Sequence, residues 1–194
     1  MTTQSLIANR KSKIALYWPL IKSTQTGLLL ATGIAGYLSA GTPIGLLTLL
    51  GMSFSLFFAI SGSTIMNMWY DRDIDAKMKR THKRSAASGE LNHNEVFWVG
   101  TAISILGVGW ALLIAPFYGL VVFAGWFFDV VIYTLWLKRR TAWSIVWGGI
   151  SGGMPILAGR VLGMGGFDWI GVILSLGILF WIPTHILTLS LIHI

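Results

Sequence analysis

The sequence of 194 residues contains no cysteine and only seven acidic residues. The absence of cysteine excludes disulfide bonds, thiolate metal ligands and cysteine nucleophiles. Charged residues make up only 11% of the chain, whereas hydrophobic residues make up 55% and include ten tryptophans. This balance excludes an ordinary soluble domain and predicts a membrane protein.

The net charge of +7 does not indicate a nucleic-acid partner, because the Lys and Arg residues lie in short groups between apolar runs. Basic residues in such positions are typical of membrane-topology determinants. The N-terminal stretch lacks the early apolar core and the small-residue cleavage pattern of a signal peptide. We therefore expect no nucleic-acid binding, and we expect residues 1–15 to form a polar leader.

The apolar runs predict an all-α, polytopic transmembrane helix bundle that forms a single domain over residues 1–194. Six spanning helices are visible, at residues 18–40, 44–66, 96–115, 118–137, 142–162 and 169 onward. The second run alone is long enough to cross a hydrocarbon core of ~30 Å. In the fifth run, the glycines between Gly148 and Gly153 lie at i, i+4 spacing, which predicts close helix packing.

The basic residues also predict an orientation. Thirteen of the fourteen Lys and Arg fall on one side of the bundle, and only Arg160 lies toward the other side. The positive-inside rule therefore predicts that this side faces the cytoplasm, and we expect an integral protein of the plasma (inner) membrane. Its leader, residues 1–15, and its longest polar segment, residues 68–95, are expected to be cytoplasmic.

Three of the seven acidic residues lie within five positions of that polar segment. If the segment is helical, Asn67, Asp71 and Asp75 share one face, and Asp73 points nearly opposite. One carboxamide and two carboxylates at a helix end can hold a hard divalent cation. The six basic residues between Arg72 and Arg84 suit phosphate oxygens, so the segment predicts a metal–diphosphate site. The alternative is a juxtamembrane loop whose charges neutralise one another in water.

Other polar side chains are candidates for a cavity beside this site. Asp129 lies midway along the fourth run with Tyr133 one turn later, and a carboxylate inside the membrane is costly and indicates function. The alternative for Asp129 is a structural hydrogen bond, or a carboxyl group that burial keeps neutral. His185 lies near the cytoplasmic end of the sixth run, where it is either a hydrogen-bonded anchor or part of the same cavity. Asp73 is the fourth candidate for this cavity.

The pattern N-x-x-x-D-x-x-x-D over residues 67–75 resembles the first acidic motif of the UbiA-type intramembrane prenyltransferases. The strings at 70–81, 133–141 and 180–185 more narrowly resemble the haem O synthase branch of that family, the protohaem IX farnesyltransferases. The resemblance runs from about residue 22 to residue 189. It implies a UbiA-like prenyltransferase fold.

This resemblance also implies an activity, a cofactor and partners. A farnesyl group would pass from farnesyl diphosphate to a vinyl group of haem B, inside the lipid bilayer, to make haem O. The cofactor would be Mg2+, and its implied ligands, also the catalytic residues, are Asn67, Asp71 and Asp75. The basic residues implied to bind the diphosphate are Lys77, Arg80 and Arg84. Contact with the haem–copper oxidase assembly machinery is a further implied partnership.

The sequence also departs from the family pattern. Lys22-Ser23-Thr24 stands where a Lys-Pro-Arg-like start is usual, and Arg84-Ser85 replaces Arg-Pro. The family carries a second acidic motif and further helices beyond the sixth, so we expect a fragment that lacks its C-terminal helices and can be inactive. Two other hypotheses stay open. One is a UbiA-type transferase acting on an aromatic or lipid acceptor, and the other is a membrane transporter or assembly protein.

Overall fold

The computed structural model describes residues 12–79 and 81–192, and beyond Ile182 it describes the side chains of Thr184 and Thr188 only. The described residues form helices joined by turns, which confirms the predicted all-α fold. The helices are α1 (Lys13–Tyr17), the 3-10 helix η2 (Trp18–Ile21), α2 (Ser23–Leu38), α3 (Leu46–Tyr70), α4 (Arg72–Asp75), α5 (His93–Ile114), α6 (Pro116–Phe127), the π-helix η3 (Phe128–Leu137), α7 (Ser144–Met164) and α8 (Trp169–Ile192).

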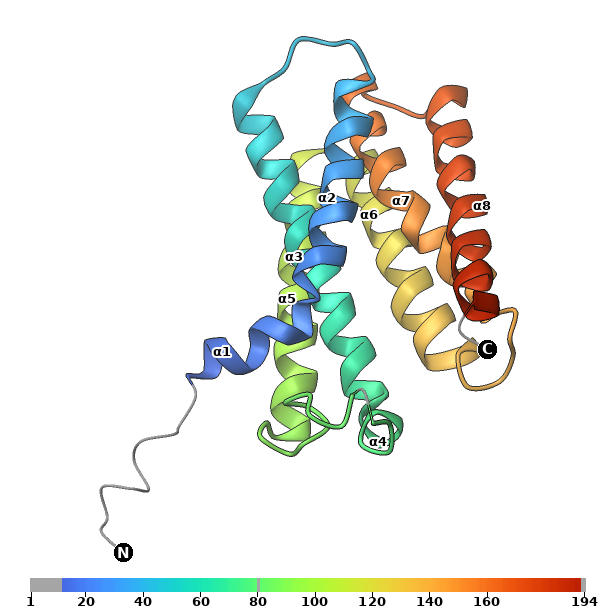
Figure 1. Cartoon of the computed structure of the whole chain (residues 1–194). Helices are drawn as coiled ribbons and strands as arrows, with labels where there is room; N and C mark the ends of the chain where they lie inside the picture. The colour runs from blue at the N-terminus through green and yellow to red at the C-terminus, as the bar shows by residue number, and fades with distance from the viewer. Residues whose placement is uncertain (1–11, 80, 193–194) are drawn as a thin grey trace, which may run out of the picture.

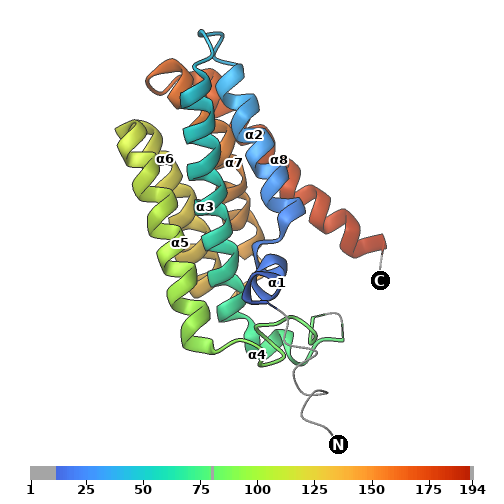
Figure 2. The same cartoon turned by 90° about the vertical axis from the view of Figure 1, so that its left-hand side faces the viewer.

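The long helices run along one another in a single bundle (Figure 1). Helix α3 packs against α5, and α7 packs against α2, α6 and α8. The α2–α3 and α7–α8 loops lie at one end of the bundle. The short helices α1 and α4 lie at the other end, beside the loop that follows α4 (Figure 2). The acidic segment is therefore placed at one end of the bundle.

Four helical stretches are long and apolar enough to cross a membrane: Leu46–Tyr70, His93–Ile114, Pro116–Leu137 and Ser144–Met164. The part of α8 up to Ile182 is a shorter apolar helix, and α2 has 16 residues, so four of the six predicted spans are confirmed by length and composition. Large apolar side chains point outward from the bundle, as at Leu47 and Leu113, which are 85% and 86% exposed. This outer surface is the one expected of an integral membrane protein.

The first predicted span begins differently from the expectation. Trp18–Ile21 is a 3-10 turn, and the α-helix starts only at Ser23. Lys22, between them, has a left-handed backbone with φ 47° and ψ 59°, which a non-glycine residue adopts at a cost of roughly 1–2 kcal/mol. This reversal breaks the helix that the apolar pattern predicted, and it delivers the Lys22 side chain to the cavity described below.

Glycines allow the helices around α7 to approach closely. A Cβ atom on Gly153 would lie 2.6 Å from Ser175 Oγ on α8, and one on Gly159 would lie 1.9 Å from the Gly33 carbonyl oxygen on α2. Neither distance leaves room for a side chain. The close packing predicted from the glycine spacing of this helix is confirmed.

Two apolar clusters hold the bundle together. One joins α2, α3, α5, α6 and α7 around Met52, Leu56 and Tyr118. The other lies at the end that carries the acidic segment, where Ala86 and Leu91 of the loop after α4 pack with Ile65, and with Leu20 of η2. This second cluster anchors the loop after α4 against the rest of the bundle.

Candidate active site

The acidic segment keeps helical spacing across the junction between α3 and α4. The Asp71 amide donates to the Asn67 carbonyl oxygen over 3.0 Å, and the Asp75 amide donates to the Asp71 carbonyl oxygen over 2.8 Å. Asn67, Asp71 and Asp75 are buried, at 7%, 9% and 6% exposed. The side chain of Asp73 is 60% exposed. The exposed Asp73 and the three buried side chains agree with the prediction that Asp73 faces away from the other three.

Lys138, the residue after η3, joins the first two of these side chains. Its Nζ atom donates to Asn67 Oδ1 over 2.9 Å and also to Asp71 Oδ2. The sequence analysis counted Lys138 only among the thirteen basic residues that predict the orientation, and it missed this contact. The one signal in the sequence was its place in the family-like string at residues 133–141.

Asp75 binds a different base. Arg84 Nη1 donates to Asp75 Oδ2 over 2.8 Å, and the Thr81 hydroxyl donates to the Asp75 backbone carbonyl over 3.0 Å. These bonds close the loop after α4 back onto the end of that helix. Lys77 is exposed in this loop, and Arg80 lies outside the described residues. The diphosphate contacts expected of these bases stay a prediction.

Asp73 lies on the outer side of the segment, where it pairs with Arg139. The guanidinium donates to both carboxylate oxygens, over 3.0 and 2.6 Å, and it also stacks 4.2 Å from the centre of the Tyr70 ring. These hydrogen bonds hold the pKa of Asp73 below its usual value. Asp73 lines an outer hollow with Trp69 and His93, so it lies outside the central cavity where it was a candidate.

The side chains near Lys138 fit a hard divalent cation. Asp71 Oδ1 is buried and has no hydrogen-bond partner among the described residues, while its other oxygen faces Lys138. Carboxylate and carboxamide oxygens are the ligands that Mg2+ prefers. No group of three or more His, Asp or Glu side chains within the described residues could hold a metal ion. The full set of Asn67, Asp71 and Asp75 as ligands is therefore still a prediction.

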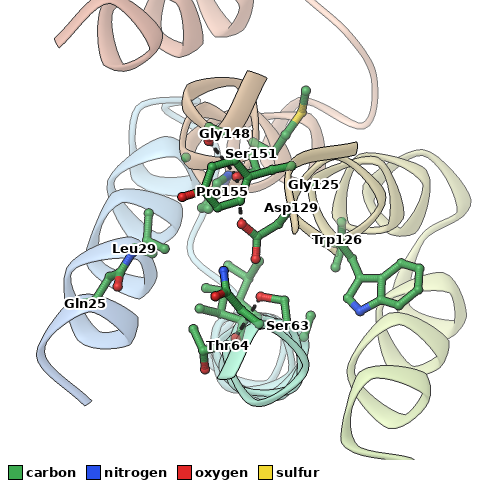
Figure 3. A pocket seen from close by; sticks show the side chains of 18 of the residues that line it. Gln25, Leu29, Ser63, Thr64, Gly125, Trp126, Asp129, Gly148, Ser151 and Pro155 are labelled. Atoms are coloured by element: carbon green, nitrogen blue, oxygen red, sulfur yellow. Dashed lines mark hydrogen bonds between the residues drawn. The ribbon is translucent and has the colours of Figure 1, made fainter. Parts of the chain in front are cut away.

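A cavity of about 240 Å³ adjoins this site (Figure 3). Asn67 and Lys138 belong to its wall, as do the predicted candidates Asp129 and Tyr133. Most of the remaining wall is apolar: Leu29, Leu56, Ala59, Ile60, Val122, Met154, Pro155, Ala158 and Ile182. The cavity therefore combines a charged edge with a lining suited to a hydrocarbon chain.

Two further polar residues, Lys22 and His185, bear on the wall of this cavity. Lys22 lines it, which the sequence analysis missed because the apolar pattern placed this lysine inside a regular helix. His185 lies within α8, but its side chain is outside the described part of the structure. Its place in the cavity stays a prediction.

The family model that describes the UbiA prenyltransferases matches residues 28–193. The chain belongs to the UbiA prenyltransferase family. Among curated proteins, it is 44% identical over 172 residues to a protoheme IX farnesyltransferase of Archaeoglobus fulgidus, covering 88% of this chain and 60% of that relative. It is 38% identical over 184 residues to the protein of the same name from Korarchaeum cryptofilum, covering 95% of this chain and 62% of the relative.

Solved structures show the same fold. A structure of a digeranylgeranylglyceryl phosphate synthase superposes with a TM-score of 0.75 at 26% identity, covering 86% of this chain and 58% of that one. A UbiA homologue from Archaeoglobus fulgidus bound to DMAPP and Mg2+ superposes with a TM-score of 0.74 at 18% identity, covering 88% and 62%. This chain thus spans about three fifths of the length of such relatives.

Proposed function

We propose that this UbiA family member transfers a farnesyl group from farnesyl diphosphate to a vinyl group of haem B, and so makes haem O. The observation that carries the proposal is the meeting of Asn67, Asp71 and Lys138 at the edge of an apolar cavity. Anion-binding and cation-binding groups lie together there, beside a lining that suits a prenyl chain. The relatives named protoheme IX farnesyltransferase support haem as the acceptor.

The acidic residues and the basic residues of the site would act on the diphosphate in different ways. Asn67 and Asp71, together with Asp75, would hold Mg2+, which supplies positive charge against the diphosphate oxygens. Lys138 presents an ammonium group at the same place, and it can donate to a diphosphate oxygen as the allylic C–O bond breaks. Arg84 is a second basic group at this site, because it donates a hydrogen bond to Asp75. This is electrostatic stabilisation of a leaving group, and it needs no protein nucleophile.

The cavity would protect the prenyl group once the C–O bond breaks. Apolar side chains such as Leu56, Val122 and Met154 shield an allylic cation from bulk water. The vinyl group of haem then supplies the electron pair of the new C–C bond, and water completes the hydroxyethyl product.

A second acceptor class has its own support. The digeranylgeranylglyceryl phosphate synthase resembles this chain in fold at 26% identity, which favours a lipid acceptor. The farnesyltransferase relatives at 38–44% identity favour haem more strongly. We propose haem as the acceptor, in an enzyme of the plasma membrane whose acidic segment faces the cytoplasm. Contact with the haem–copper oxidase assembly machinery belongs to the same proposal.

The test is prenyl transfer by the purified protein in lipid nanodiscs. The protein is incubated with Mg2+, farnesyl diphosphate and haem B, and the products are identified by mass spectrometry. We expect haem O from the wild-type protein and at least about 10²-fold less from Asp71→Asn. Prenylation of a lipid or aromatic acceptor, with haem B left unchanged, would exclude the haem assignment.

A further inference from the structure

Three polar side chains face one another inside the apolar part of the cavity. Asp129 of η3 points between Ser151 of α7 and Ser63 of α3 (Figure 3). The Ser151 hydroxyl lies 3.5 Å from Asp129 Oδ1. The three groups come from three different helices, so the packing of the bundle brings them together.

The hydrogen bonds of the two serines decide what this cluster can bind. The Ser63 hydroxyl donates to the Ile60 carbonyl over 3.0 Å, and the Ser151 hydroxyl donates to the Gly148 carbonyl over 2.7 Å. A hydroxyl has one proton, and for Ser151 the carbonyl bond is much shorter than the contact with Asp129. Both serine oxygens therefore keep lone pairs free, next to the Asp129 carboxyl group, whose Oδ1 is a longer second acceptor for the Ser151 hydroxyl.

A cluster of acceptors selects a ligand that donates. A water molecule bound through its two protons, one to Asp129 and one to a serine, would turn its own lone pairs toward the cavity. Buried water needs two to four polar partners, and this site provides three. The orientation is the one that an attacking water requires.

The local backbone supports a functional reading of Asp129. It lies in η3, a π-helix in which the Lys138 amide donates to the Tyr133 carbonyl five residues earlier, over 2.8 Å. Turns of this kind are rare and frequent at functional sites. The titratable groups around the same cavity are Lys22, Lys138 and Tyr133. Asp71 already pairs with Lys138, and Lys22 is the other basic side chain in the wall of this cavity.

We propose that Asp129, with Ser63 and Ser151, holds the water that completes the transfer and accepts its proton. This inference rests on the proposed function. The vinyl π electrons form the C–C bond to farnesyl C1, and diphosphate leaves with the electron pair of the C–O bond. The resulting cation on the vinyl carbon next to the porphyrin ring is captured by a water lone pair. One O–H bond of that water breaks, and the proton passes to the Asp129 carboxylate.

The distances along α3 agree with this order of events. Ser63 precedes Asn67 by four residues, which is about 6 Å along a helix. The water site is therefore about one turn deeper than the groups that bind the diphosphate. That separation leaves room for the vinyl carbons between the bond that breaks and the water that attacks.

The product of Asp129→Asn tests the proposal, because asparagine keeps the shape of the side chain and cannot take the proton. In nanodiscs with Mg2+, farnesyl diphosphate and haem B, we expect farnesylated haem still to form. The cation would instead lose a proton to give a product without the hydroxyl group. The ratio of hydroxylated to dehydrated product should fall about 10²-fold, the low end for general-base catalysis. Ser151→Ala should lower the ratio less, and Ser53→Ala, whose hydroxyl bonds to Leu49 outside the cavity, should not change it.

An unchanged ratio, or equal loss of both farnesylated products, would overturn the role of Asp129. If the wild-type protein forms no farnesylated haem, the proposed function fails, and a second measurement still decides on Asp129. Infrared difference spectra of wild-type protein minus Asp129→Asn should show the loss of an ionised carboxylate band at neutral pH, with a shift in H2(18)O from a bound water. Loss of a protonated carboxyl band instead would show that Asp129 cannot accept a proton.

Discussion

Lys138 Nζ lies 2.9 Å from Asn67 Oδ1, although the two residues are 71 positions apart in the chain. The same ammonium group also bonds to Asp71, so one base from the end of η3 neutralises the part of the acidic face nearest the cavity. A cation bound between Asn67 Oδ1 and Asp71 Oδ2 would take the place that the Lys138 ammonium group now holds. Lys138 is thus both the resting partner of the acidic face and a donor available to a diphosphate.

Lys138→Gln should therefore destabilise the protein and increase its response to Mg2+. The substitution leaves a buried carboxylate without its partner, and we expect a loss of roughly 1–3 kcal/mol, since the lysine is partly exposed. Added Mg2+ should then raise the Tm of this variant more than that of the wild-type protein. Thermal unfolding in detergent, with and without Mg2+, measures both effects. Arg140→Gln removes a neighbouring exposed base and is the matched control.

An equal response of Lys138→Gln and wild-type protein to Mg2+ would show that the cation does not bind near Lys138. Equal destabilisation by Arg140→Gln would assign the effect to the charge of the whole basic run.

The carboxylates of the acidic segment should differ in their effect on activity. Asp71→Asn and Asp75→Asn each remove a charged ligand oxygen, and we expect prenyl transfer to fall by about 10²-fold or more, as for the loss of several kcal/mol. Asp73→Asn should be mild, because Asp73 is outside the cavity and pairs with Arg139. Initial rates at varied Mg2+ and farnesyl diphosphate measure the difference. Equal loss at Asp73 would mean that all three carboxylates serve the metal.

The apolar pattern was enough to predict an all-α bundle and four of its spanning helices, and the spacing of the acidic residues was enough to predict that Asp73 faces away from Asn67, Asp71 and Asp75. Asn67, Asp71 and Asp75 stay in step because hydrogen bonds between residues four apart continue across the junction of α3 and α4, and that is a local property. The partners of these residues could not be predicted in the same way. Lys138 reaches Asp71 only because η3 and α3 pack together, and Ser151 reaches Asp129 only because α7 packs against η3. Tertiary contacts between distant segments leave no periodic signal.

The orientation in the membrane can be tested without first removing any residue, since the chain contains no cysteine. Lys79 is exposed in the loop after α4, and Thr42 is exposed at the opposite end of the bundle. In intact cells, a membrane-impermeant maleimide should label Thr42→Cys and leave Lys79→Cys unlabelled. After the membrane is opened, both should react. The reverse pattern in intact cells would show that the acidic segment faces outward.

The end of the bundle opposite the acidic segment contains a pair whose effect should depend on pH. Arg160 of α7 is buried and donates to both carboxylate oxygens of Asp168 through Nε, over 2.9 and 2.8 Å, and to the Ser39 carbonyl over 2.7 Å. The hydrogen bonds from Arg160 lower the pKa of Asp168 below its usual value. The folded protein therefore binds the proton of Asp168 less readily than the unfolded chain does.

A carboxyl group with a lowered pKa stabilises the fold above its unfolded-state pKa, and that stabilisation is lost as the pH falls through the lower, folded value. We expect Asp168→Asn to lower the Tm at neutral pH, because it leaves the buried Arg160 guanidinium without its anion. The difference in Tm between wild-type protein and the variant should shrink as the medium is acidified below about pH 4, near the ordinary pKa of aspartate. Thermal unfolding of both proteins across pH 3–7 measures this difference. A constant difference over the whole range would show that Asp168 acts through its hydrogen bonds, including the one from the Gly171 amide, rather than through its charge.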